Sequence, residues 1–123
     1  MRKASLTALL LGPLFVAAAA AAAGSATDAG PVVRLEVDAP ADCTTREELA
    51  ARIAARSRRI ELAPDAATTV RVTVAPGPGG RAVAGALTIA RPGAAPATRR
   101  ITAASCDQAT DGLALVIALA LDP

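Results

Sequence analysis

The sequence contains no histidine, tyrosine or tryptophan, and only one phenylalanine, one methionine and two cysteines. Without histidine, it lacks the side chain on which most acid–base catalysis and most zinc sites depend. A single aromatic ring also gives nucleic-acid bases no surface on which to stack. The chain has 13 basic and 11 acidic residues, and its only lysine is Lys3, which follows Arg2. The remaining charge is balanced, which argues against nucleic-acid binding because neutralising phosphates requires a surplus of cations.

Alanine is the most abundant residue and fills 34 of the 123 positions. Alanine side chains bury little apolar surface, so the interior depends on the valine, leucine and isoleucine residues. The length is that of one small domain.

The N-terminus has the pattern of a secretory signal peptide over residues 1–26. A short basic region, Arg2 and Lys3, precedes an apolar stretch from Leu6 to Val16, and a run of alanines follows. We therefore predict that the protein is exported to the periplasm or secreted.

Cleavage after Ala23 and cleavage after Ala26 both satisfy the small-residue rule, so both remain open. Residues 27–31 then form a short lead-in, and residues 32–123 form a single domain. The alternative is an uncleaved membrane anchor over residues 4–23, although a central Gly-Pro pair weakens such a helix.

Two cysteines, Cys43 and Cys106, remain after cleavage. Exported proteins mature where thiols are oxidised, so we predict one disulfide between them. The loop-entropy model assigns such a bridge about 4 kcal/mol of stabilisation. Two free thiols or an intermolecular bond are the alternatives. A metal site is not expected, because two thiolates without histidine cannot complete a tetrahedral shell.

The first part of the domain predicts a strand followed by a helix. Apolar and polar residues alternate from Val32 to Asp38, which is typical of a strand with one buried face. Thr44 and Glu47 have the spacing of a capping box, and we predict a helix over residues 44–62. Within it, Glu48 and Arg52 are four residues apart and are expected to pair.

Three further strands are predicted at residues 68–75, 81–90 and 98–104, with Gly/Pro-rich loops between them. The last of these strands has one strong inward residue, Ile101. Residues 107–122 follow as an apolar segment that we interpret as a helix capped by Asp107, with a buried strand as the alternative.

The resulting order is β-α-β-β-β-α, in the α+β class. We predict a two-layer sandwich, in which a mostly antiparallel four-stranded sheet carries two helices on one face. Cys43 and Cys106 both lie at strand-to-helix corners, and these corners meet if the first and fourth strands run in the same direction. Such a meeting would place the cysteines within disulfide distance.

The alternation leaves one face of the predicted sheet polar. Its members are Arg34, Glu36, Thr69, Arg71, Thr73, Thr98, Arg100 and Thr102. One interpretation is a solvated face with weak cross-strand ion pairs. The other is a candidate partner face centred on Arg34, Glu36, Arg71 and Arg100, where another envelope protein docks on the face or adds a strand to the sheet edge.

No residue pattern predicts catalysis or a cofactor. The loop at residues 76–80 lacks a phosphate-binding ending, so we interpret it as a turn. Asp38 and Asp42 flank a proline and suit turn or capping roles. Ser57 and Ser105 have no histidine to activate them, so we predict that the protein is not an enzyme.

The chain resembles a group of exported bacterial proteins from high-GC Gram-negative genomes. The shared features are Cys43, the pair Arg99-Arg100, Cys106 and the closing segment GLALVIALALDP from Gly112 to Pro123. The resemblance implies a periplasmic domain, often followed by a Pro/Ala-rich or membrane segment, and it implies no activity. We accordingly expect this chain to be either a domain of a longer architecture or a fragmentary gene product.

Three functional hypotheses follow. The first is a non-catalytic exported domain with an interaction or accessory role. The second is a membrane-associated envelope protein, held by an uncleaved leader or by sequence beyond the C-terminus. The third, a small-ligand-binding protein or hydrolase, lacks residues to support it.

Overall fold

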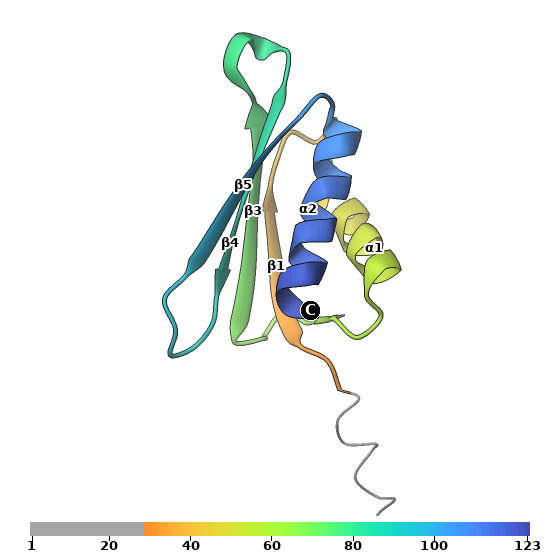
Figure 1. Ribbon diagram of the computed structural model, residues 1–123. Coiled ribbons are helices and arrows are strands. Elements are labelled where there is room, and N and C mark those ends of the chain that lie inside the picture. Colours follow the sequence, from red (N-terminus) through yellow and green to blue (C-terminus); the bar gives the residue numbers. More distant parts are fainter. Residues whose placement is uncertain (1–28) are drawn as a thin grey trace, which may run out of the picture.

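The computed structural model describes residues 29–123, so the predicted signal peptide, its cleavage sites and the alternative anchor lie outside the described residues. The elements are β1 (Val32–Asp38), α1 (Arg46–Arg56), β2 (Glu61–Leu62), β3 (Thr68–Pro76), the short 3-10 turn η3 (Pro78–Gly80), β4 (Val83–Ala90), β5 (Ala97–Ala103) and α2 (Cys106–Leu121). All strands belong to one sheet, and α1 and α2 lie on the same face of it (Figure 1). The predicted α+β fold with two helices on one face is confirmed.

The sheet has five strands in the order β2-β1-β3-β4-β5, not the predicted four. β1 pairs in parallel with both β2 and β3, whereas β3, β4 and β5 form an antiparallel meander. α1 is the crossover that two neighbouring parallel strands require. The sheet is therefore mixed, and its antiparallel part is the half that the hairpin signals predicted.

The fifth strand, β2, arises where α1 ends earlier than expected. The helix stops at Arg56 instead of continuing to Leu62. Beyond it, Glu61 donates its backbone N–H to Pro31 at 2.9 Å, and Ala63 donates to Val33 at 2.9 Å. These donors pair with β1 and cannot continue the helical ladder. Ile60 lies in the turn after α1, and its side chain is buried in the core.

Each helix begins at a different cap from the one predicted. Thr45, not Thr44, caps α1, and its side chain accepts from the backbone N–H of Glu48 at 3.1 Å. Ser105, not Asp107, caps α2 and accepts from the N–H of Gln108 at 3.2 Å. Several suitable hydroxyl or carboxylate residues precede each helix, and only the fold selects among them.

The apolar closing segment is helical, as predicted, and α2 runs across β4 and β5. Its inner side is completely buried, including Leu113 and Ile117. Its outer side is not: Leu115 is 40% exposed and Leu119 is 59% exposed. Within residues 29–123, no helix has the length and apolar character needed to cross a membrane.

The core that residues 29–123 form lies between the helices and the sheet and contains no aromatic ring. Its largest fully buried apolar side chains come from both helices and from β1, β3 and β4: Leu49, Ile53, Leu87, Leu113, Ile117, Val33, Val70 and Val72. The inward positions of β1, β3 and β4 match the predicted alternation, so the opposite face of the sheet remains without a helix.

Candidate functional site

The helix-free face of the sheet, called here the uncovered face, presents arginine, threonine and alanine side chains. Strand pairing places Arg34 beside Thr69, and Glu36 beside Arg71. Arg100 lies on the same face, beside Ala86 of β4. The structure thus brings all four residues of the predicted partner face to one side of the molecule.

Glu36 is the centre of a polar network on this face. It accepts two hydrogen bonds from Arg71, from Nε at 3.1 Å and from Nη2 at 2.9 Å. Nε of Arg34 lies 3.5 Å from the other carboxylate oxygen, and Nη2 of Arg34 donates to the hydroxyl of Thr69 at 3.2 Å. These groups are solvent-accessible, so the pairs contribute under about 1 kcal/mol each to stability. They do fix the directions of two guanidinium groups.

Two shallow hollows mark the uncovered face. One, of about 310 Å³, is lined by Arg34, Thr69, Arg71, Thr88 and Ala90. The other, of about 350 Å³, includes Arg100 and small side chains from β3, β4 and β5. The threonine hydroxyls supply both donors and acceptors; those of Thr88 and Thr98 lie 3.2 Å apart. The face is therefore equipped to form hydrogen bonds and ion pairs, with little apolar bulk.

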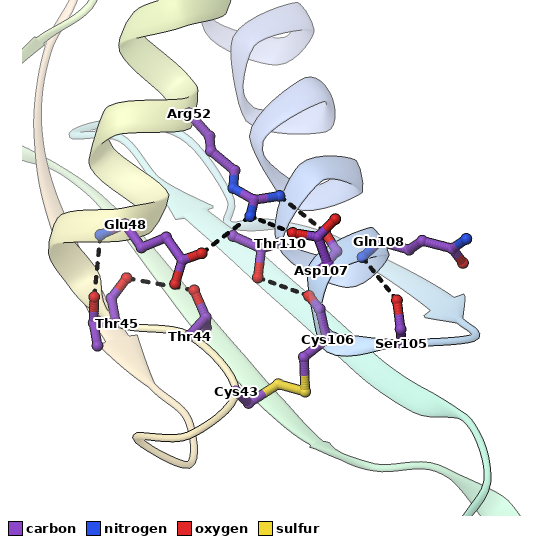
Figure 2. Close-up of a disulfide and its surroundings, with 10 residues drawn as sticks. All are labelled: Cys43, Thr44, Thr45, Glu48, Arg52, Ser105, Cys106, Asp107, Gln108 and Thr110. Carbon is purple, nitrogen blue, oxygen red and sulfur yellow. Dashed lines mark hydrogen bonds and ion pairs between the residues drawn. A yellow bond between two sulfur atoms is a disulfide. The ribbon is translucent and has the colours of Figure 1, made fainter.

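A disulfide joins the starts of the two helices (Figure 2). Cys43 is the last residue of the turn after β1, and Cys106 is the first residue of α2. Their sulfurs are bonded at 2.03 Å, and their Cα atoms lie 5.1 Å apart. β1 and β5 run in the same direction, which brings the two strand-to-helix corners together as predicted. The disulfide prediction is confirmed.

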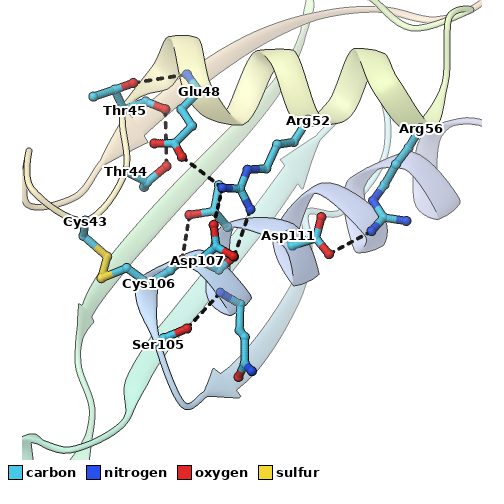
Figure 3. Close-up of polar contacts among 12 residues, drawn as sticks. Cys43, Thr44, Thr45, Glu48, Arg52, Arg56, Ser105, Cys106, Asp107 and Asp111 are labelled. Carbon is cyan, nitrogen blue, oxygen red and sulfur yellow. Dashed lines mark hydrogen bonds and ion pairs between the residues drawn. A yellow bond between two sulfur atoms is a disulfide. The ribbon is translucent and has the colours of Figure 1, made fainter.

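Beyond the disulfide, a line of ion pairs connects the two helices (Figure 3). Arg52 of α1 pairs with Glu48, as predicted, and also with Asp107 of α2. Arg56 pairs with Asp111 at 3.0 Å, one turn further along both helices. The hydrogen bond from Arg52 to Asp107 is the largest cause of the raised pKa of Arg52.

This line of pairs was not predicted, although a signal for it exists. Basic residues four apart in one helix face acidic residues four apart in the other. The match becomes meaningful only when the helices lie side by side with their starts together, which the disulfide ensures.

The other polar residues considered in the sequence have local structural roles. Ser57 closes α1 and donates to Asp122 at 2.6 Å, while Ser105 caps α2. Asp38 ends β1 and Asp42 lies in the following turn, both exposed to solvent. In the part of the chain that the structure describes, no group of three or more potential ligands could hold a metal ion.

The loop at residues 76–80 is the tip of the β3–β4 hairpin. It contains η3, and both Gly79 and Gly80 adopt positive φ angles, of 77° and 72°. Glycine adopts this conformation without the steric cost that a Cβ would add. The interpretation of this segment as a turn is confirmed.

Comparisons with known proteins give no family for this chain. No protein-family model matches the sequence, and no curated protein matches it. The resemblance carried by the cysteine pair and the closing segment therefore stays a prediction.

Proposed function

We propose that this chain is a non-catalytic interaction or accessory domain that acts outside the cytoplasm. On this proposal, it binds another envelope protein through the uncovered face of its sheet. The observation that carries the proposal is the arrangement of the sheet, which buries one face under both helices and leaves the other face to ordered arginine and threonine side chains. The disulfide is compatible with an oxidising compartment.

The chemistry of the face favours a protein partner with carboxylate groups. Arg34 and Arg71 are held in place by Glu36 and Thr69 and keep donors directed along the surface. Arg100 has no carboxylate within ion-pair distance among residues 29–123. Guanidinium groups bind carboxylates through paired hydrogen bonds, and threonine hydroxyls can complete the contact.

A capture experiment tests this function. The oxidised protein is immobilised and exposed to an envelope fraction, beside the double variant Arg34→Ala, Arg71→Ala. A second variant, Arg58→Ala, Arg81→Ala, removes the same charge from exposed positions away from the face. We expect the wild type and this control to retain the same protein, and the uncovered-face variant to lose it.

Two results would contradict the proposal. One is retention of the same proteins by all three forms, which would show that the arginines of the face are not used. The other is recovery of nothing specific by the wild-type protein. Urea denaturation of each variant confirms that a loss of capture does not reflect unfolding, since exposed ion pairs contribute little to stability.

A further inference from the structure

The outer edge of β5 is a second surface suited to binding. The sheet order ends at β5, so this strand pairs with β4 on one side only. β5 is seven residues long and most of its side chains are exposed. The opposite edge, β2, has only two residues and offers little backbone to pair with. An edge strand with open backbone groups is a template for another strand.

Two adjacent arginines lie in the middle of β5 and face opposite sides of the sheet. Arg100 pairs with Ala86 on the uncovered face, and Arg99 pairs with Leu87 on the helix side. Neither has a carboxylate within ion-pair distance in the described part of the chain. A strand added at this edge would therefore meet an unpaired cation on each of its faces.

The helix side of this edge also carries apolar surface. Arg99 lines a hollow of about 310 Å³ together with Val116, Leu119 and Ala120 of α2. Leu119 is 59% exposed, the largest exposure among the bulky apolar residues of the described chain. An apolar side chain on an added strand could pack in this hollow while its neighbours in sequence face the other side.

A second copy of this chain fits the edge poorly. Antiparallel pairing of β5 with β5 of another copy would bring four arginines into one short interface without supplying a carboxylate. Like charges across a strand pair are destabilising. An acidic partner gains the ion pairs that a second copy lacks.

We propose that the edge of β5 binds an extended segment of a partner protein by strand addition. In this segment, acidic residues that lie beside Arg100 on the uncovered face alternate with apolar residues that lie beside Leu119 on the helix side. The inference rests on the proposed function, because it names the chemistry of a protein partner. Main-chain hydrogen bonds to β5 would supply the affinity, and Arg100 and Leu119 would select the side chains.

Defined peptides test this inference without knowledge of the partner. The probe is a labelled peptide of eight residues that alternates glutamate and valine, titrated with the oxidised protein by fluorescence anisotropy. A second peptide replaces glutamate with lysine. A third keeps the acidic sequence but carries N-methyl groups on one glutamate and one valine, so that both of its edges lose a backbone donor.

We expect the acidic peptide to bind and the lysine and N-methylated peptides to bind at least about tenfold more weakly. The variant Arg100→Glu should weaken the acidic peptide by about tenfold, since the cross-strand attraction on the face that carries the glutamates becomes repulsive. The matched variant Arg58→Glu makes the same charge change away from β5 and should bind as the wild type does.

Equal binding of the N-methylated peptide would show simple charge attraction and overturn strand addition. Unchanged binding by the β5 variant would overturn the assignment of the edge, as would absence of binding to the wild type. If the wild type sediments as a dimer and the β5 variant as a monomer, a second copy of the chain, and not an acidic partner, occupies the edge. None of these outcomes bears on capture through Arg34 and Arg71, so the two proposals fail separately.

Discussion

At the residue scale, the close packing of the last helix against the sheet depends on two glycines. Gly85 of β4 lies under α2, and a Cβ placed there would lie 3.2 Å from Cδ1 of Leu113 and 3.3 Å from Cγ1 of Ile101. Gly112 of α2 is similar, since its Cβ would lie 3.2 Å from Cδ1 of Ile101. These two glycines let the last helix approach β4 and β5 closely, which a core without aromatic rings needs in order to close.

The variant Gly85→Val should therefore lower the free energy of unfolding by about 1–3 kcal/mol, the usual cost of overpacking. Urea denaturation of the oxidised protein measures the change. The neighbouring variant Ala84→Val serves as the control, because Ala84 belongs to the uncovered face and valine suits a strand. Equal stability of Gly85→Val and the wild type would show that α2 can move away at no cost.

At the scale of the elements, the sequence predicts whatever depends on a repeating pattern. The alternation of β1, β3 and β4 identified their inward residues, and the two Gly/Pro clusters identified the turns of the meander. β2 could not be found, because two residues such as Glu61 and Leu62 show no period. The uncovered face was predictable for the same reason as the core, being its complement along each strand.

The helix α2 illustrates what composition leaves open. Residues 113–121 are all apolar, which predicted that the segment would be buried or docked. The structure buries Leu113 completely and leaves Leu119 largely in solvent, although both are leucines of one helix. The apolar run does not distinguish the two sides of α2. Gly112 lies on the side that faces the sheet, and Asp107 and Asp111 pair with α1.

This difference gives a matched pair of substitutions. Leu113→Ala should cost about 2–5 kcal/mol of unfolding free energy, because it removes a fully buried side chain and leaves a cavity. Leu119→Ala should change stability by no more than about 0.5 kcal/mol, as expected for an exposed position. Thermal or urea denaturation separates the two, and a large loss at Leu119 would indicate that this surface is covered in solution.

At the scale of the whole molecule, the disulfide joins the corner between β1 and α1 to the corner between β5 and α2. The two cysteines are 63 residues apart in sequence, and β2, β3, β4, β5 and α1 all lie between them. Closing so long a loop lowers the conformational entropy of the unfolded chain by an amount worth about 4 kcal/mol. The ion pairs between α1 and α2 then align the remainder of both helices.

Reduction and alkylation of the protein should consequently lower the free energy of unfolding by about 4 kcal/mol. The double variant Cys43→Ser, Cys106→Ser should show a similar loss without a reductant. Urea denaturation of the oxidised, reduced and substituted forms makes the comparison. If all three unfold at the same urea concentration, the helix contacts alone hold the domain together.

The tip of the β3–β4 hairpin lies within the loop that the disulfide closes, and Arg81 is exposed there. A trypsin nick after Arg81 would leave one fragment with Cys43 and another with Cys106, still joined through sulfur. The nicked protein would migrate as an intact chain until a reductant separated its pieces. A cleavage event at this tip would thus be invisible to non-reducing electrophoresis, and the two pieces would stay close enough to reassemble.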